Sequence, residues 1–440
     1  METLSDDLLP VLFSTLPVNS LCACEAVSKD WQAAAADDTI WRQHCKRHWP
    51  SSNVGPVAPT HKECFRSANG WQKLSLIPRL VYDDLTHRDP TIRARRSSSA
   101  ELATFDATDD LLITSSRSDG SHKVRLHRPG EPAHLRRGFD DGQGHWISDI
   151  KLLPAAHGGG ELPRALAVIN ESLCAIDLSR LEPGVLSSLD AVGSQIWTNN
   201  ILDGSLLTVL PAADGLSALC RTDSGIIHLD LGGGEAVLTR NLRYLLEAEP
   251  DYVISACSDS VHAPNEASLA VRGGQRSYIL HTDLRLPGAS AFVGTHRTGH
   301  GQIRRLAHAG DGSRTVLASH SRSKDIQIWD LRMLRDYSEN PRTAAWASAA
   351  DTFTCSGNAP DFSCEHGIIA AVSAGTPGTT YGARLQIFSS SPRRLSETIN
   401  LPEIVLDENY RLMLPQGVKL TGRHLHFAAD KTRVIQCAVP

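Results

Sequence analysis

The strongest constraint on the fold is a strand-like block that returns seven times after Ser97. The blocks recur at intervals of roughly fifty residues and are separated by turn-forming Gly, Asp, Ser and Pro. They are Val124–His127, Leu173–Leu178, Ile226–Leu231, Tyr278–Leu284, Ile326–Leu331, Leu385–Phe388 and Val434–Cys437. One strand type that repeats at a nearly even period indicates one small sheet per repeat, with the sheets arranged radially.

Seven such returns predict a β-propeller, and one repeat is sharper than the others. It begins at Gly299-His300, contains the strand Val316–Ser319 and ends at Trp329-Asp330. This unit resembles a WD repeat, which runs from a Gly-His pair to a Trp-Asp pair. By that resemblance His300, Ser319, Trp329 and Asp330 are structural residues of the blade, although Ser323 stands where the family has an Asp. The other six blocks keep only the hydrophobic ending, so we expect a divergent WD-like propeller with seven blades.

Two features bear on this prediction. Kelch repeats fit less well, because the glycine runs 158–160 and 232–234 lack regularly following aromatic residues. A propeller must also join its first and last blades to avoid an open sheet edge. The segment Leu76–Tyr82 could supply a strand beside Val434–Ala438, or the last block could provide four strands by itself.

The first fifty residues carry a helical pattern instead. Apolar side chains recur at helical offsets between residues 7 and 16, and Pro17 ends this helix and permits a second. Ser28 can cap a third helix and Asp38 a fourth, because their side chains accept hydrogen bonds from free first-turn amides. Helices this short bury little apolar surface, so we expect a partner to cover some of it.

This pattern resembles the F-box, the adaptor-docking module of cullin-RING ubiquitin ligases. The four family signatures are matched in order by Leu4-Ser5, Leu16-Pro17, Val27–Trp31 and Trp41. Ser5 replaces the usual Pro of the first signature, and Ser28 replaces a frequent Cys of the third.

The resemblance implies that ten side chains divide between a small core and the surface held by the Skp adaptor. They are Leu4, Leu8, Leu9, Leu12, Phe13, Leu16, Pro17, Leu21, Val27 and Trp31. Leu12 and Phe13 are the preferred anchors. The sequence does not sort the two sets, and a bundle docked only on its own chain is the structural alternative.

The chain is therefore expected to be an α+β multidomain protein. Residues 1–50 form the F-box-like module, residues 51–75 a linker and connecting helix, and residues 76–440 the propeller. Apolar residues from Cys64 to Trp71 fall at helical offsets. A rigid connecting helix would fix the distance between adaptor and target, whereas a loosely held connector would not.

Several chemistries find little support. Cys45, His48, His61 and Cys64 have a spacing that could present zinc ligands, but structural side chains around a tether explain it better, and no metal or cofactor is expected. A net charge of −5 makes no general case for nucleic acid. The longest apolar stretch is interrupted by Pro211, so no membrane span is expected. No phosphate-binding loop or nucleophile elbow appears.

The ten cysteines are scattered and no export signal is apparent, which favours reduced thiols and a cytosolic or nuclear location. By resemblance, the chain would be a non-catalytic substrate receptor of an SCF-type ubiquitin ligase. The F-box would bind the Skp adaptor and, through it, the cullin-RING ligase, while interblade loops would bind an unknown target protein. Two alternatives remain open: a scaffold without a ligase role, and a propeller enzyme whose pocket is assembled from distant loops.

Overall fold

The computed structural model shows a helical module followed by β-sheets. It describes residues 8–48, 60–62, 65, 77–83, 101–108, 110–118, 121–128, 137–140, 146–153, 164–182, 185–197, 206–211, 217–222, 225–231, 236–241, 253–260, 263–273, 276–283, 292–298, 302–308, 315–320, 323–331, 349–355, 358–365, 368–374, 382–389, 395–405, 417–421, 424–428 and 433–438. Within these residues, no helix has the length and hydropathy of a membrane span.

The module contains four consecutive helices. They are α1 (Leu8–Thr15), α2 (Val18–Cys24), α3 (Lys29–Ala35) and α4 (Asp38–His48). Ser28 caps α3 as predicted, since its Oγ accepts the Trp31 amide at 3.2 Å. The predicted cap of α4 is wrong by one residue: the Asp37 carboxylate accepts the Thr39 amide at 2.8 Å, which leaves the Asp38 side chain available for another contact.

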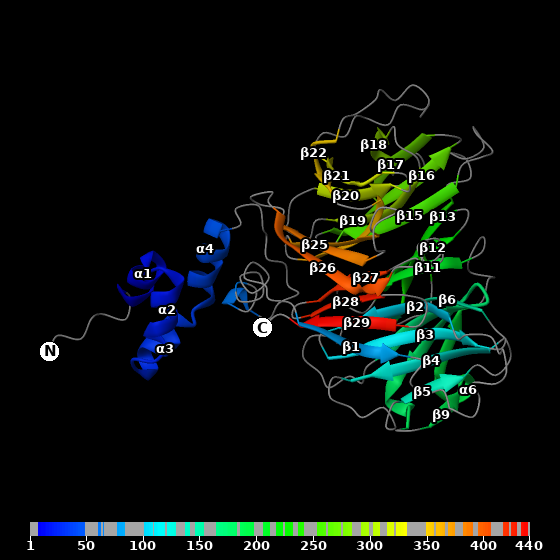
Figure 1. The fold of residues 1–440 in the computed structure, drawn as a ribbon, viewed down its shortest axis with the longest axis horizontal. Helices are drawn as coiled ribbons and strands as arrows, with labels where there is room; N and C mark the ends of the chain where they lie inside the picture. The colour runs from blue at the N-terminus through cyan, green and yellow to red at the C-terminus, as the bar shows by residue number, and fades with distance from the viewer. Residues whose placement is uncertain are drawn as a thin grey trace.

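The helices surround a small core of their own. Phe13 and Trp31 meet edge to face with ring centroids 5.3 Å apart. The Trp41 indole N–H donates to the carbonyl of Ala35 at 2.7 Å, which satisfies a polar group that would otherwise be buried unpaired. The buried members of this core are Leu9, Phe13, Leu21, Cys24, Ala35, Ile40, Trp41, Cys45 and Phe65. None of them comes from a sheet, so the module has a separate core (Figure 1).

Within the described residues, the strands form seven sheets, numbered here along the chain. Sheet 1 contains β2 (Glu101–Ala107), β3 (Leu112–Ser118), β4 (Ser121–His127), β5 (Arg137–Asp140) and β9 (Leu186–Ser188). Sheet 2 contains β6 (Ile147–Leu152), β7 (Arg164–Ile169), β8 (Ser172–Asp177) and β10 (Gly193–Trp197). The short helices η4 (Leu178–Arg180) and α6 (Leu189–Val192) flank β9 in the chain.

Sheets 3, 4 and 5 are antiparallel meanders. Sheet 3 contains β11 (Leu206–Pro211), β12 (Ser217–Thr222), β13 (Gly225–Asp230) and β14 (Ala236–Asn241). Sheet 4 contains β15 (Val253–Ser260), β16 (Ala263–Gly273), β17 (Arg276–Asp283) and β18 (Phe292–Thr298). Sheet 5 contains β19 (Ile303–His308), β20 (Thr315–His320), β21 (Asp325–Asp330) and β22 (Asp351–Thr354).

The last two sheets complete the arrangement. Sheet 6 contains β23 (Asn358–Glu365), β24 (Ile368–Ala374), β25 (Gly382–Ser389) and β26 (Leu395–Val405). Sheet 7 contains β27 (Val418–Leu420), β28 (His424–Ala428), β29 (Arg433–Ala438) and β1 (Ile77–Asp83). The first strand of the chain thus pairs with the last, antiparallel, with Ile77 opposite Ala438 and Asp83 opposite Arg433.

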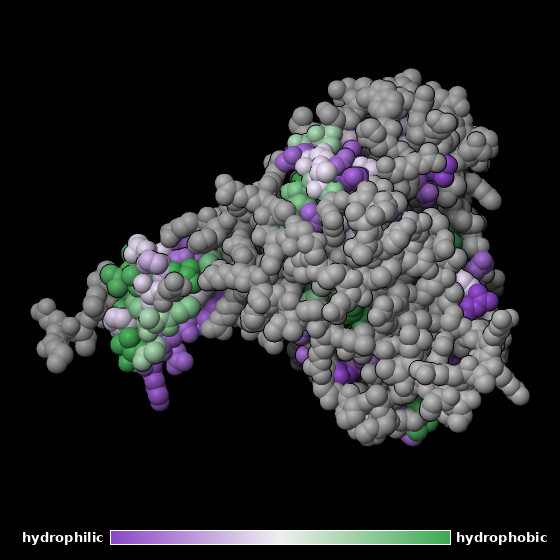
Figure 2. Space-filling model, viewed as in Figure 1, coloured by the Kyte–Doolittle hydropathy of each residue, from purple (hydrophilic) through white to green (hydrophobic). Residues whose placement is uncertain are grey.

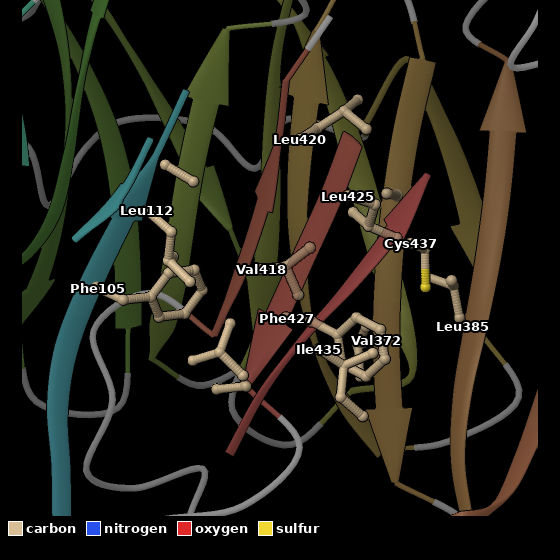
Figure 3. Packing of buried hydrophobic residues seen from close by; sticks show 14 of the residues in the cluster. Phe105, Leu112, Val372, Leu385, Val418, Leu420, Leu425, Phe427, Ile435 and Cys437 are labelled. Carbon is tan, nitrogen blue, oxygen red and sulfur yellow. The ribbon is translucent and has the colours of Figure 1, made fainter. Parts of the chain in front are cut away.

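This pairing confirms the predicted strand contribution from Leu76–Tyr82. Sheet 7 also shares a continuous apolar core with its two neighbours, sheet 1 and sheet 6. In Figure 3, Phe105 and Leu112 from sheet 1 and Val372 and Leu385 from sheet 6 join residues of sheet 7. The first and last sheets are therefore joined in two ways: by the backbone hydrogen bonds between β1 and β29, and by apolar burial between sheets.

The predicted blade residues are described in part. Ser319 and Trp329 are buried on β20 and β21, and Asp330 is half-buried at the end of β21. His300 lies outside the described residues. Ser323 hydrogen-bonds to Asp325 two residues later, with its Oγ accepting the Asp325 amide at 3.0 Å, so it fixes the turn that leads into β21.

Candidate functional site

Helix α1 divides its apolar residues between two faces. Leu9 and Phe13 are buried and Leu16 is half-buried, so the residues at offsets of three and four face the small core. Val11 and Leu12 lie on the other side, with 63% and 47% of their surface exposed. The helix therefore uses one face for folding and leaves the second face apolar but uncovered.

The uncovered apolar residues are concentrated on this module. Among the described residues, five large apolar side chains are exposed, and Val11, Leu12 and Val27 belong to the helical module. Figure 2 shows hydrophobic residues, in green, at the surface of the module. Scattered exposed apolar residues are ordinary, but several on one small domain indicate an interaction surface.

The structure sorts the ten side chains that the sequence left unsorted. Leu9, Phe13 and Leu21 are buried, Leu16 and Trp31 are half-buried, and Leu12, Pro17 and Val27 are exposed. Leu8 begins α1, and Leu4 lies outside the described residues. Of the two preferred anchors, Leu12 remains accessible to a partner. Phe13 is fully buried, so its first role is to hold the helices together.

A part of the connecting segment docks against the module. The His61 backbone amide donates to one Asp38 carboxylate oxygen at 2.6 Å, and His61 Nδ1 lies 2.6 Å from the other. Lys62 forms an ion pair with Glu25. Partial burial raises the pKa of Asp38, but the hydrogen bonds and charge of His61, with the charge of Arg42, outweigh it and hold the pKa below its ordinary value of 3.8.

Phe65 completes this contact from the same segment. It is buried, and its ring meets the Trp41 ring edge to face at 5.6 Å. The helical offset of Phe65 was visible in the sequence, but its partner was not, because the two residues are far apart in the chain. Cys45 Sγ contacts the His61 carbonyl at 3.4 Å, so this thiol serves the same docked contact.

A buried charge network joins sheets 1, 2 and 7. Asp149 and Lys151, both on β6, form an ion pair at 2.7 Å, and both side chains are almost wholly buried. Asp106 on β2 pairs with Lys419 on β27 at 3.1 Å and accepts the amide of Leu152 at 2.9 Å. Buried charges are tolerated only when they are paired and hydrogen-bonded, as they are here.

The electrostatics of Asp106 follow from these contacts. Burial raises the pKa of Asp106, but the charges of Lys419 and Lys151 and the hydrogen bond from the Leu152 amide outweigh it and lower the pKa below 3.8. The carboxylate is therefore ionised at neutral pH. The partners already present satisfy the charges of this network, which makes it a structural joint between blades.

Sequence reasoning missed three hydroxyl–imidazole contacts elsewhere in the sheets. Ser268 Oγ lies 3.1 Å from His281 Nδ1 and 3.2 Å from His308 Nε2, which connects sheet 4 to sheet 5. Thr114 Oγ1 lies 3.2 Å from His127 Nε2 within sheet 1. No local sequence pattern identifies these contacts, because the burial of the hydroxyl and imidazole groups is a property of the fold.

Eight cysteines have described side chains, and all eight are free thiols. Burial raises the pKa of Cys174 to about 11 and of Cys437 to about 12, and burial with the charge of Asp325 raises the pKa of Cys355 to about 12. These thiols stay protonated at neutral pH and pack as small apolar groups.

Comparison with known proteins separates the same two parts of the chain. The F-box-like family model matches residues 6–47. The WD40 domain of Toxoplasma gondii coronin matches 83% of this chain and 87% of its own, with a TM-score of 0.53 and 11% identity. The Myceliophteria thermophila Cps50 (Swd1) β-propeller domain matches 78% of this chain and 98% of its own, with a TM-score of 0.50 and 13% identity. No curated protein sequence matches the chain.

Proposed function

The chain combines an F-box-like domain with a WD40-type β-propeller, and we propose that it is the substrate receptor of an SCF-type ubiquitin ligase. In this role the helical module binds a Skp-type adaptor, and the adaptor links the chain to a cullin-RING ligase. The propeller binds a target protein. The proposed setting is the cytoplasm or the nucleus.

One observation supports the adaptor contact most directly. The F-box-like module leaves Leu12, Val11 and Val27 uncovered although Leu9 and Phe13 on the same α1 helix are buried. A partner that covers these side chains would gain apolar burial without disturbing the core. A few large side chains at the centre of such an interface carry most of the binding energy.

The proposed receptor accelerates ubiquitin transfer without a catalytic group of its own. It holds a target near the conjugating enzyme that the ligase recruits, which raises the effective concentration of the reacting groups. The contacts of Asp38 and His61 and of Phe65 and Trp41 support this role, because they tie part of the connecting segment to the F-box-like module.

Co-purification from cells tests the proposal. Tagged full-length protein should bring down both adaptor and cullin, and Leu12→Asp should lose both, because a charge at an apolar interface is costly to bury. Val185→Asp is the matched control: Val185 is also exposed, at 46%, but lies in the sheet-forming part, so its variant should retain both partners.

The same experiment decides between the proposal and a non-degradative scaffold. If the wild-type chain brings down the adaptor and never a cullin, the chain is a scaffold that uses the same surface. If neither partner is recovered with the wild-type chain, the adaptor assignment itself is wrong.

A further inference from the structure

One hydroxyl group on the helical module lies outside a helix. The serines and threonines of residues 8–48 are Ser14, Thr15, Ser20, Ser28 and Thr39. Four of them are within helices, whereas Ser28 lies between the ends of α2 and α3. Ser28 is exposed, and its φ of −158° and ψ of 169° give it an extended backbone. The module therefore presents this hydroxyl to an enzyme more openly than the other four.

Ser28 borders the uncovered apolar surface of the module. Val27, the residue before it, has 63% of its surface exposed, and Ala26 is exposed as well. Lys29 and Asp30, which follow Ser28, are exposed and charged. Ser28 thus stands at the boundary between apolar and charged surface. A new charge on Ser28 would lie beside a side chain that the proposed adaptor contact covers.

The present role of Ser28 in the fold leaves its hydroxyl open to modification. Its Oγ accepts a hydrogen bond from the Trp31 amide at 3.2 Å, which caps α3. Acceptance uses a lone pair of the oxygen and not the hydroxyl proton. Trp31 also packs against Phe13, so α3 is held by the core of the module as well as by its cap. A group that retains an oxygen at this position can therefore keep α3 in place.

The hydroxyl is also a departure from the F-box signature, which frequently has Cys at this position. A thiol is not an acceptor for a serine/threonine kinase, whereas a serine hydroxyl is. This chain therefore carries a phosphoryl acceptor at a place where the signature frequently has none.

We propose that Ser28 is a phosphorylation site that controls docking of the adaptor. A serine/threonine protein kinase transfers the γ-phosphoryl group of ATP to Ser28 Oγ. The Oγ–P bond forms, the bond between the γ-phosphorus and the leaving oxygen of ADP breaks, and the hydroxyl proton passes to the aspartate base of the kinase. The phosphate carries a charge of about −1.5 to −2 at neutral pH. This inference rests on the proposed receptor function, to which it adds a switch.

Phosphorylation turns docking off and leaves the module folded. The phosphate is one residue from Val27, so a partner that covers Val27 must also strip water from the phosphate. Removal of water from a charge costs more than the burial of one valine returns. The core is unaffected because its buried residues, Phe13 and Trp41 among them, do not include Ser28.

Two substitutions separate the charge from the cap. Ser28→Asp and Ser28→Asn both keep an oxygen that can accept the Trp31 amide, and they differ by one negative charge. In titrations of purified full-length chain with purified adaptor, Ser28→Asn should bind as the wild type does. Ser28→Asp should bind about tenfold or more weakly. Gln43→Glu is the matched control, because it adds one negative charge at an exposed position of α4, and it should bind as the wild type does.

Amide hydrogen exchange separates a binding defect from a folding defect. Protection in α3 should be the same in the wild type, Ser28→Asp and Ser28→Asn, because each retains the cap. Ser28→Ala lacks the cap and should exchange faster in α3. If Ser28→Asp loses α3 protection together with adaptor binding, the charge acts on the fold and the switch is overturned.

Mass spectrometry of full-length chain purified from cells treated with a phosphatase inhibitor tests the modification itself. We expect phosphate on Ser28, and phosphatase treatment of that fraction should restore adaptor affinity about tenfold or more. Ser28 found only unmodified would overturn the site. Wild-type binding with equal affinities of Ser28→Asp and Ser28→Asn refutes the switch alone, whereas a wild-type chain that does not bind the adaptor refutes the receptor function and the switch with it.

Discussion

The carboxylate of Asp149 on β6 accepts a hydrogen bond from the backbone amide of Val209 on β11 at 3.1 Å. This contact joins the first strand of sheet 2 to the first strand of sheet 3. Asp106 makes the equivalent contact from sheet 1 to Leu152 of sheet 2. Asp361 makes it from sheet 6 to Gly417 of sheet 7. In each case a carboxylate on the first strand of one sheet satisfies an amide on or immediately before the first strand of the next sheet.

Asp149→Ala tests this joint. The substitution leaves Lys151 buried without its partner and the Val209 amide without its acceptor, so we expect a loss of about 3–5 kcal/mol in the free energy of unfolding of the propeller. Urea unfolding followed by tryptophan fluorescence measures it. Asp110→Ala, at an exposed turn position, should change stability by less than about 0.5 kcal/mol. Equal stability of the two variants would show that the joint is unimportant.

Asp106 predicts a pH dependence of propeller stability. Its pKa in the folded chain lies below the ordinary 3.8, so its stabilising contribution is fully present above that value and is lost as the pH falls through the lowered pKa. The thermal unfolding midpoint should therefore decrease when the pH is lowered below about 4. Asp106→Asn should be less stable at neutral pH and should show a shallower acid decline. An acid profile identical to that of the wild type would contradict the account.

Phe13→Ala separates core from surface within α1. Phe13 is fully buried beside Trp31, so its truncation should cost about 3–5 kcal/mol of module stability, whereas Leu12→Ala should cost far less because Leu12 is exposed. Amide hydrogen exchange in α1 and α3 reports the difference. Similar exchange rates in the two variants would mean that the two faces of α1 are not distinct.

Phe65→Ala tests whether the connecting segment belongs to the module. Removal of its ring empties the space beside Trp41, so hydrogen exchange in α4 should accelerate while exchange in the sheets stays unchanged. A variant with unaltered α4 protection would show that the segment is only loosely attached.

Much of the architecture could be predicted because it depends on local patterns. Repeated apolar blocks indicated small radial sheets. The sequence left two ways to complete the last sheet, and the structure shows the one in which a strand from Leu76–Tyr82 pairs with β29. The Ser28 cap was also predictable, since a cap involves only the next few residues. The Asp38 cap was not, because adjacent Asp37 competes for the same amides and the His61 contact that occupies Asp38 comes from a distant segment.

The charged joints and the contact between Arg117 and Trp146 had no comparable sequence signal. Asp149 and Lys151 read as ordinary polar residues of a strand, and their importance comes from burial and from the Val209 amide of another sheet. Arg117 on β3 and Trp146, the residue before β6, meet only because sheets 1 and 2 lie side by side. Contacts between repeats depend on their geometry, which a single sequence does not encode in any local pattern.

The uncovered face of α1 is the surface that we propose binds a Skp-type adaptor, and direct titration of the purified full-length chain with purified adaptor tests this proposal. We expect saturable binding by the wild type, binding weakened about tenfold or more by Leu12→Asp, and an unchanged unfolding midpoint for that variant. An adaptor that does not bind the wild-type chain, or that binds Leu12→Asp equally well, would contradict it.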